Sequence, residues 1–394
     1  MNERKLYPVS IRCNILYIQD TMKKILFITS LSGKRLNYFM MSSILAAKNN
    51  ELEFHLACNT SNADLIEYKK DCINHNIYLH HIDFQRHPLN PINLRALFQV
   101  KKLLTQKFDI IHTNTPIGGL IGRVASIGKT AKVIYTAHGF HFHSKGSLLS
   151  WLIYYPIEYV LSYFTDSLVT INQEDYNISK KMKSKRKIFI PGVGFDSSFK
   201  SSEDIYISKP TKMNNQPIRI ISIGELNKNK NHILSIKAIS QLENIEYLIC
   251  GEGKLRPKLQ KLINRLKSSD KIVLLGHRSD VKELLSSSDI FVFPSKREGL
   301  SIALMEAMSI GLPCLVSNIR GNRDLIDING GCLFNSKKEL CDHIDLLRND
   351  ISLRIKMGEY NKIKIQNFSL DVVVKKYSEL YKEMLGGLNE KYSS

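Results

Sequence analysis

Residues 290–307 read Ile-Phe-Val-Phe-Pro-Ser-Lys-Arg-Glu-Gly-Leu-Ser-Ile-Ala-Leu-Met-Glu-Ala. The unbroken apolar run 290–293 indicates a strand that is buried on both faces. Pro294 ends this strand, a polar loop follows, and a helix begins near Ser301. A strand that leads through a loop into a helix is the repeating unit of a parallel α/β sheet. Because such sheets bind ligands at the carboxyl ends of their strands, the loop 294–301 is a candidate site.

The same alternation of strand and helix runs through the whole chain. Apolar, β-branched runs are separated by helical patterns of roughly 10–15 residues, as in βαβ units. In the first half the predicted strands are 25–29, 54–57, 110–112, 133–136, 168–171 and 188–190. In the second half they are 218–223, 247–250, 272–275, 290–293, 314–316 and 332–334. Two such series predict an α/β protein with two Rossmann-like, doubly wound parallel-sheet domains.

The domain boundaries follow from polar stretches that lack periodicity. We expect residues 1–21 to be a disordered N-terminal extension, followed by an N-terminal domain over 22–195. A stretch rich in Ser, Asp, Asn and Lys, 196–216, predicts a linker to a C-terminal domain over 217–368. The amphipathic pattern of 369–394 predicts a closing helix that crosses back to the first domain.

The chain is strongly basic. Its 394 residues include 56 Lys and Arg against 37 Asp and Glu, which gives a net charge of +19. This charge calls for an anionic partner: nucleic acid, an anionic membrane surface or a phosphorylated small molecule. The densest basic run, 180–187, has no zinc-finger spacing, arginine-rich arm or aromatic RNA-binding motif beside it, so we expect no nucleic acid.

The composition indicates what kind of protein this is. With 43% hydrophobic and 24% charged residues, the chain is an ordinary globular protein, which excludes disorder, collagen and coiled coils. We expect no signal peptide, and the sequence contains no apolar run of about 18 residues that would span a bilayer. The seven scattered cysteines form no C-x-x-C pair and predict reduced thiols in a cytoplasmic protein.

Two carboxylates occupy the candidate loop and the helix after it. Glu298 lies in the loop, and Glu306 lies one and a half turns into the helix, where it can point to the same crevice. Carboxylates accept hydrogen bonds from sugar or ribose hydroxyls, and a helix N-terminus attracts phosphate. A lone Glu before a helix is usually only a cap, so the longer string decides the interpretation.

That string resembles the E-x7-E signature of the retaining glycosyltransferases of family 4 in the GT-B superfamily. The continuation Met308-Ser309-Ile310-Gly311-Leu312-Pro313-Cys314 is also similar to the strand entry of that family. The resemblance covers nearly the whole chain from about residue 23 and implies a GT-B fold, with two domains facing across a cleft. It implies that Glu298 faces the donor sugar and that Glu306 binds the ribose. Backbone N–H groups of Gly299, Leu300 and Ser301 would contact sugar or phosphate.

A second loop resembles the first loop of the C-terminal domain in that family. Gly224-Glu225-Leu226-Asn227-Lys228-Asn229-Lys230 follows a predicted strand. Gly224 permits close approach of the backbone to a ligand, and Lys230 supplies a cation for a diphosphate. Glu225 occupies a position where an Arg that pairs with the phosphates is common in the family, so we expect phosphate binding to depend mainly on Lys230.

Three further glycine-containing loops follow predicted strands. His277 and Arg278, after Gly276, correspond to a loop that touches the nucleotide base in relatives. Gly33 would belong to the glycine loop of the N-terminal domain, whose sequence is not the dinucleotide-binding G-x-G-x-x-G. The string 251–253, Gly-Glu-Gly, is a weak signal that a turn explains equally well.

The string 135–143 contains three histidines at H-x-x-H-x-H spacing. A metal site is one interpretation, but no carboxylate or cysteine in the string completes a ligand set and no D-x-D occurs in the chain, so we expect no metal. The string resembles the branch of family 4 that assembles surface polysaccharides and glycans on polyprenyl diphosphate. By that resemblance His138 lies against the donor sugar and the β-phosphate, and His138, Lys230 and Glu298 are the catalytic candidates.

The stretch 148–164 is rich in aromatic residues and contains the only Trp. It could lie in a membrane interface, but Pro156 and Glu158 interrupt it, and the sequence favours a buried helix.

The resulting hypothesis is a metal-independent, retaining hexosyltransferase without a cofactor. It would move an N-acetylhexosamine from a UDP-sugar to a polyprenyl-diphosphate-linked saccharide, in the cytoplasm, on the inner face of the membrane. Two alternatives remain: a GT-B nucleotide-sugar epimerase, and a non-enzymatic basic protein that binds nucleic acid or membrane.

Overall fold

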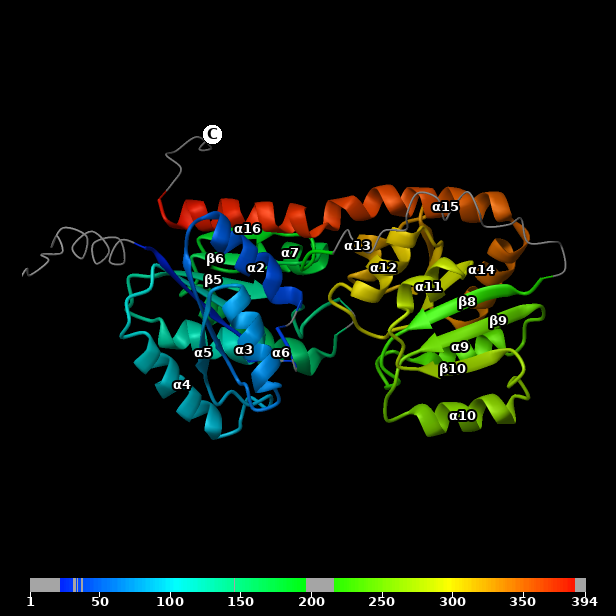
Figure 1. Ribbon diagram of the computed structural model, residues 1–394, viewed down its shortest axis with the longest axis horizontal. Helices are drawn as coiled ribbons and strands as arrows, with labels where there is room; N and C mark the ends of the chain where they lie inside the picture. Colours follow the sequence, from blue (N-terminus) through cyan, green and yellow to red (C-terminus); the bar gives the residue numbers. More distant parts are fainter. Residues whose placement is uncertain are drawn as a thin grey trace, which may run out of the picture. The chain divides into compact units, whose positions relative to one another are not determined.

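The computed structural model describes residues 22–30, 33, 35–36, 38–144, 146–195 and 216–386. The predicted extension at 1–21 and nearly all of the predicted linker lie outside these residues. The chain divides into two compact units (Figure 1). The first comprises Met1–Thr170, Ile178–Ile188 and Val374–Ser394, and the second comprises Ile171–Asn177 and Phe189–Val373.

The first unit is built around a seven-stranded sheet with strand order β3-β2-β1-β4-β5-β6-β7. Its strands are β1 (Lys24–Ile28), β2 (Glu53–Cys58), β3 (Ile77–His81), β4 (Ile110–Asn114), β5 (Lys132–Ala137), β6 (Ser167–Thr170) and β7 (Arg186–Phe189). The neighbouring strands from β3 through β6 pair in parallel. The connecting helices are α2 (Tyr38–Asn49), α3 (Leu65–Asn74), α4 (Ile92–Leu103), α5 (Pro116–Ala125) and α6 (Leu148–Ser162). Helix α7 (Gln173–Ser179), which precedes β7, is assigned to the second unit as far as Asn177.

The second unit contains a six-stranded sheet with strand order β10-β9-β8-β11-β12-β13, also paired in parallel. Its strands are β8 (Ile218–Ile223), β9 (Ile245–Cys250), β10 (Ile272–Gly276), β11 (Ile290–Phe293), β12 (Cys314–Ser317) and β13 (Gly331–Phe334). Its first helices are α9 (His232–Ile239), α10 (Arg256–Arg265), α11 (Val281–Ser286), α12 (Ile302–Ile310) and α13 (Asn322–Leu325). They are followed by α14 (Lys337–Asn349), α15 (Ile351–Lys364) and the 3-10 turn η2 (Ile365–Phe368). The last helix is α16 (Leu370–Met384), which belongs to the first unit from Val374 onward.

These sheets confirm the predicted fold class. All twelve predicted strands are present, with ends shifted by at most two residues. The sequence analysis missed β3, because this strand lies at the sheet edge and its burial alternates irregularly along Ile77–His81. Edge strands are solvated on one side, so they lack the continuous apolar run that marks a buried parallel strand.

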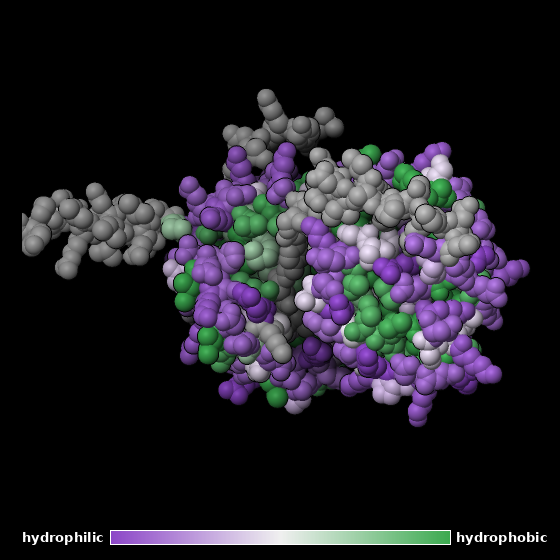
Figure 2. Space-filling view, turned by 45° about the vertical axis from the view of Figure 1, so that its right-hand side comes forward, coloured by the Kyte–Doolittle hydropathy of each residue, from purple (hydrophilic) through white to green (hydrophobic). Residues whose placement is uncertain are grey.

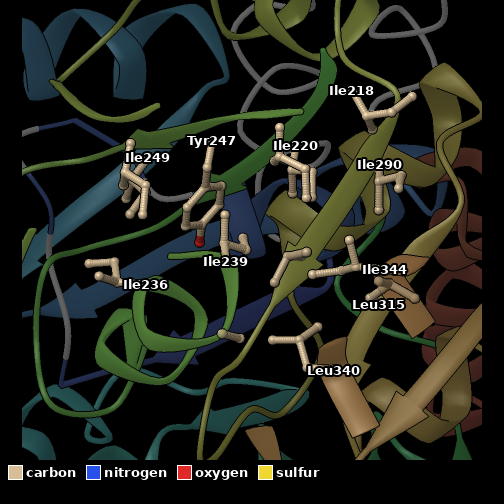
Figure 3. Close-up of a cluster of buried hydrophobic side chains, with 14 of the residues drawn as sticks. Ile218, Ile220, Ile236, Ile239, Tyr247, Ile249, Ile290, Leu315, Leu340 and Ile344 are labelled. Carbon is tan, nitrogen blue, oxygen red and sulfur yellow. The ribbon is translucent and has the colours of Figure 1, made fainter. Parts of the chain in front are cut away.

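The apolar runs of the second sheet form its core. In Figure 3, isoleucines of β8 and β9 pack around Tyr247 together with side chains from α9, β11 and α14. The Tyr247 hydroxyl is not stranded there, since it shares hydrogen bonds with Ser222 and Ser235 at 2.6 and 2.8 Å. Burial of each isoleucine or leucine side chain in this core contributes about 1.5–3 kcal/mol to the stability of the fold.

Both strand orders reverse direction at one point. In the first sheet β1 and β4 are neighbours, but the chain continues from β1 to β2 on one side and from β4 to β5 on the other. In the second sheet β8 and β11 are related in the same way. At such a switch point the two following loops diverge and leave a crevice at the carboxyl ends of the strands. The loop that contains Glu298 and the loop that contains Lys230 therefore start from the same switch point.

The predicted burial of 148–164 is only half correct. Trp151, Tyr155 and Tyr159 of α6 pack on the core of the first unit, but Leu149 and Leu152 are 64% and 66% exposed. The long apolar run therefore belongs to a helix with one buried aromatic side and one exposed apolar side. None of the described helices has the length and apolar character needed to cross a bilayer. Elsewhere, the surface shown in Figure 2 carries apolar patches in a mainly hydrophilic setting.

Candidate functional site

The loops after β8 and β11 are joined by hydrogen bonds. The Lys296 amide donates to the Asn229 carbonyl at 2.8 Å, and the Asn229 side-chain amide donates to the Arg297 carbonyl at 2.9 Å. The side chain of Asn231 donates to the Pro294 carbonyl at 3.3 Å. These bonds fix the two loops as one surface at the switch point, so groups on either loop have defined positions.

Asn227 shapes the loop that presents Lys230. Its Oδ1 accepts hydrogen bonds from the backbone N–H groups of Asn229 and Lys230, both at 2.9 Å. The aliphatic part of Lys230 lies on Gly224, where an added Cβ would come within 3.1 Å of Lys230 Cδ. The Asn227 side chain fixes the turn, and Gly224 leaves room for the aliphatic part of Lys230. Together they hold the ammonium group in place.

The ammonium group of Lys230 is directed at Glu298. Its Nζ lies 2.9 Å from Glu298 Oε1 and 4.6 Å from the centre of the Phe293 ring. The two side chains are 19% and 14% exposed, so the pair is largely shielded from water. A partly desolvated ion pair at the switch point places a cation and a hydrogen-bond acceptor side by side, which suits a ligand with both phosphate and hydroxyl groups.

Helix α12 begins beside this pair. Ser301 is its N-cap residue with extended backbone, and its side chain makes no capping hydrogen bond. The first N–H groups of the helix, and the helix dipole, are therefore available to an anion. Gly299, Leu300 and Ser301 lead into this helix from Glu298, so the loop brings a helix N-terminus next to the ammonium group of Lys230.

Glu306 lies on α12 and is half-buried. Burial raises the pKa of its carboxyl to about 7. Within the described ranges, no side chain donates a hydrogen bond to the Glu306 carboxylate, and no cation pairs with it. A partly buried carboxyl group with a raised pKa and no cationic partner is typical of a residue that binds a ligand.

Three glycines allow the loops to pack this closely. A Cβ at Gly251 would lie 2.0 Å from the Gly224 carbonyl oxygen, and one at Gly253 would lie 2.6 Å from that of Leu226. Gly321, at φ +68°, would bring a Cβ within 1.9 Å of the Gly299 carbonyl oxygen. The Gly-Glu-Gly string that the sequence analysis treated as a weak turn signal therefore supports the Lys230 loop directly, and Gly321 supports the Glu298 loop.

In the first unit, His138 and Asn114 meet at the carboxyl ends of β5 and β4. His138 Nε2 lies 2.9 Å from Asn114 Oδ1, and the Phe39 ring packs edge-on against the imidazole at 5.2 Å. Burial lowers the pKa of His138 to about 4, so the ring is neutral near pH 7. Because Nε2–H donates to Asn114, the neutral ring presents Nδ1 as an acceptor and has no second N–H for a phosphate.

Comparison with known proteins identifies the family. The family model for group 1 glycosyl transferases matches residues 205–364, and the model for glycosyl transferase 4-like domains matches residues 24–172. EpsD of Bacillus subtilis, which is named as a glycosyltransferase, is 31% identical over 317 residues, covering 76% of this chain and 83% of EpsD. The chain belongs to the group 1, or family 4, glycosyltransferases.

Two other similar proteins show what this glycosyltransferase resembles. The UDP-Gal:α-D-GlcNAc-diphosphoundecaprenol α-1,3-galactosyltransferase of Escherichia coli is 27% identical, covering 74% of this chain and 80% of its own. The structure of Anabaena HepE with UDP and glucose superposes with a TM-score of 0.72 at 19% identity, covering 92% of this chain and all of HepE. The second likeness confirms the GT-B fold.

Some of the predicted donor-binding residues lie on loops other than those of Lys230 and Glu298. His277 and Arg278 are exposed at the end of β10, two strands from β8, and Arg278 is paired with Asp280 at 2.5 Å. Glu225, which replaces the Arg that is common in the family, is exposed in the loop that contains Lys230. Gly33 lies after β1, but most of its loop is outside the described residues. These positions leave the predicted roles of His277, Arg278 and Gly33 as predictions.

The three-histidine string of the glycosyltransferase is dispersed. His141 stacks on Tyr154 at 4.6 Å between ring centres, whereas His138 turns to Asn114. No group of three or more His, Cys, Asp or Glu side chains arranged for a metal ion occurs among the described residues. The sequence analysis assigned no role to Asn114, Asn227 or Gly321. Of these three residues, only Asn227 could have been recognised from the sequence, because the side chain of a loop asparagine often bonds to the backbone two residues later.

Proposed function

We propose that this glycosyltransferase transfers an N-acetylhexosamine from a UDP-sugar to a polyprenyl-diphosphate-linked saccharide, with retention of the anomeric configuration. Residues 217–368 would bind the donor, and residues 22–195 would bind the acceptor. The enzyme would act at the inner face of the cytoplasmic membrane, because its acceptor is lipid-linked. The E. coli relative named above acts on a diphosphoundecaprenol-linked sugar, which supports this acceptor class.

The observation that carries the proposal is the pairing of Lys230 with Glu298 beside the N-terminus of α12. A nucleoside diphosphate sugar offers two phosphates, a ribose and a sugar with several hydroxyls. Lys230 and the first N–H groups of α12 match the phosphates, and Glu298 matches a sugar hydroxyl. Glu306, half-buried on the same helix, would accept hydrogen bonds from the ribose hydroxyls.

The reaction step follows from the charges at this site. The acceptor hydroxyl oxygen forms a bond to the anomeric carbon on the face from which UDP leaves, while the bond from that carbon to the β-phosphate oxygen breaks. The electron pair of the broken bond goes to the phosphate, and the hydroxyl proton is transferred to a phosphate oxygen. Lys230 and the α12 dipole stabilise the negative charge that grows on UDP. Glu298 orients the sugar.

We infer a different role for His138 from the one that the family resemblance implies. We assign His138 to a sugar hydroxyl rather than to the β-phosphate, since Nδ1 of its neutral ring accepts hydrogen bonds and Nε2–H is already donated to Asn114. Gly33, His277 and Arg278 stay in the proposal as donor-binding positions on the ground of family resemblance.

A donor and acceptor screen tests the function. The purified enzyme is offered UDP-GlcNAc, UDP-GalNAc, UDP-Gal and UDP-Glc with a synthetic polyprenyl-diphosphate saccharide, and products are read by mass spectrometry and by NMR of the new anomeric centre. We expect one UDP-N-acetylhexosamine to be used with retention. UDP-Gal is the informative competitor, because it is the donor in the name of the E. coli relative. Conversion of a UDP-sugar without acceptor would favour an epimerase, and salt-sensitive DNA binding without UDP-sugar binding would favour a non-enzymatic basic protein.

A further inference from the structure

Helix α6 turns an entirely apolar row of side chains to the solvent. The row consists of Leu149, Leu152, Ile153, Pro156, Ile157 and Val160, which we call the α6 face. Their spacing of three and four residues places them on one side of the helix. Leu152 is 66% exposed and Val160 is 56% exposed. A surface helix normally turns its polar side outward, so this orientation requires an explanation.

The one charged residue of α6 points the other way. Glu158 forms an ion pair with Arg123 at 2.8 Å, in which the two side chains are 15% and 1% exposed. The Arg123 guanidinium also lies 3.8 Å from the centre of the Tyr135 ring. The helix thus keeps its charge inside the first unit, held by an arginine on α5, and leaves the α6 face without a charged group.

A basic segment borders one edge of the α6 face. The run 180–187 contains six Lys and Arg residues, and its Lys183 amide donates to Ser162 Oγ at the end of α6 at 2.8 Å. The Lys183 ammonium group lies 5.8 Å from the centre of the Tyr159 ring, and Tyr159 directly precedes Val160 of the α6 face. Lys181, Lys183 and Lys185 are exposed. Cationic side chains therefore stand beside the apolar row.

A cavity borders the other edge. It has a volume of about 220 Å³ and is lined mostly by apolar side chains, among them Leu120, Phe140 and Ile157. Ile157 belongs both to this cavity and to the α6 face, so the two apolar surfaces are continuous. Thr115 and Ser30 also line the cavity, which places it at the β1/β4 switch point of the first unit.

We propose that the α6 face inserts into the interface of an anionic phospholipid bilayer, with the basic run 180–187 on the lipid headgroups. This inference rests on the proposed function for the lipid-linked acceptor, and it names the surface that meets the membrane. An apolar helix face with a cationic border is the pattern of an interfacial helix. A second copy of the chain fits this surface less well, because a two-fold contact through α6 would bring two basic runs together.

Vesicle flotation tests the surface. The full-length enzyme should float with vesicles of phosphatidylcholine and phosphatidylglycerol, and much less with phosphatidylcholine alone. The double substitution Leu152→Glu/Val160→Glu should weaken binding by at least about tenfold, because two charged groups cannot enter the acyl boundary. Lys181→Glu/Lys183→Glu should remove the preference for phosphatidylglycerol. Ile363→Glu, at an apolar residue on α15 that is 74% exposed, is the matched control and should float like the unmodified enzyme.

The remaining outcomes separate this inference from the proposed function. The Leu152→Glu/Val160→Glu variant should keep its thermal midpoint, UDP affinity and transfer to a water-soluble acceptor with a short alkyl chain. Unchanged flotation of that folded variant would overturn the inference. A dimer in sedimentation velocity that the substitutions convert to monomer, with vesicle binding unaffected, would also overturn it and make α6 a subunit interface. If the unmodified enzyme floats as expected but transfers no sugar, the function is wrong and the surface stands.

Discussion

Lys230 and Glu298 lie on different loops, 68 positions apart in the sequence, yet Lys230 Nζ and Glu298 Oε1 are 2.9 Å apart. The contact exists because β8 and β11 are neighbours at the switch point and their following loops are bonded to each other. The ammonium group of Lys230 is paired with the Glu298 carboxylate. A bound diphosphate would compete for that ammonium group, which couples donor binding to the freedom of Glu298.

The first prediction separates the roles of this pair. Lys230→Ala should weaken UDP binding by about 10- to 100-fold and lower kcat by about 100-fold, because a charge-assisted contact to phosphate is lost. Glu298→Gln should lower kcat as strongly but leave UDP affinity unchanged or higher, since Lys230 is released from its carboxylate. Isothermal titration with UDP and steady-state kinetics measure both quantities. Equal loss of UDP affinity in the two variants would contradict the division of roles.

The second prediction concerns ligand binding by Glu306. Its pKa of about 7 means that half of the carboxyl groups are protonated near neutral pH. An ionised carboxylate can accept hydrogen bonds from two ribose hydroxyls, so UDP affinity should rise as the pH increases from 6 to 8. Glu306→Gln should bind UDP about tenfold more weakly, with a flatter pH profile. A wild-type affinity that does not change over this range would remove Glu306 from the ribose site.

The same pKa predicts an effect on stability with the opposite sign. The folded-state pKa lies above the ordinary value of 4.5, so the protonated form favours the folded state. This contribution is fully present below pH 4.5 and is lost as the pH rises through 7. The loss amounts to at most about 3 kcal/mol, since the group keeps some contact with solvent. Glu306→Gln should therefore raise the thermal midpoint relative to wild type at pH 8, and much less at pH 5.

The fold could be predicted because its signals are local and continuous. Runs such as Ile218–Ile223 and Ile290–Phe293 are buried on both faces, and their boundaries match the structure. The Lys230 and Glu298 loops could be found because each follows such a run. Gly321 could not be found, since its importance comes from a Gly299 carbonyl oxygen that only the folded chain brings within reach.

The orientation of α6 illustrates a second limit. Its composition is that of a buried helix, and hydropathy alone does not state which side faces the core. That side is decided by Arg123 and Tyr135, which hold Glu158 inside. In the same way, the pairing of His138 with Asn114 depends on β4 and β5 being neighbours, a relationship between strands that the sequence pattern does not order.

The third prediction concerns the protonation of His138. Since its pKa is about 4, His138 should contribute no inflection to the pH profile of kcat between pH 5 and 8. Asn114→Asp would place a carboxylate at the Nε2–H group and raise the pKa of His138 toward neutrality. Activity of this variant should then fall as the pH drops through the new pKa, because the cationic ring no longer accepts at Nδ1. Asn114→Ala is the control that removes the hydrogen bond without adding charge. A variant profile identical to that of wild type would mean that the ring does not act as an acceptor.

The fourth prediction is that transfer needs no divalent cation. Lys230 and the N-terminus of α12 supply positive charge where UDP departs, so excess EDTA should leave the rate of transfer unchanged. The measurement compares initial rates with EDTA, with added magnesium and with manganese. A rate that falls with EDTA and returns with one of the metals would show that the leaving phosphates need a metal ion in addition to Lys230.

The fifth prediction uses two glycines that both have a positive φ. Gly321 and Gly128 have φ of +68° and +79°, so alanine strains the backbone at both positions by about 1 kcal/mol. At Gly128 an added Cβ meets nothing within 4 Å, whereas at Gly321 it would lie 1.9 Å from the Gly299 carbonyl oxygen. Gly128→Ala should lower the thermal midpoint slightly and keep full activity. Gly321→Ala should displace the loop that contains Glu298 and lower kcat by at least tenfold, beyond any loss explained by stability. Equal activity in the two variants, measured well below both midpoints, would show that the close packing on Gly299 does not position Glu298.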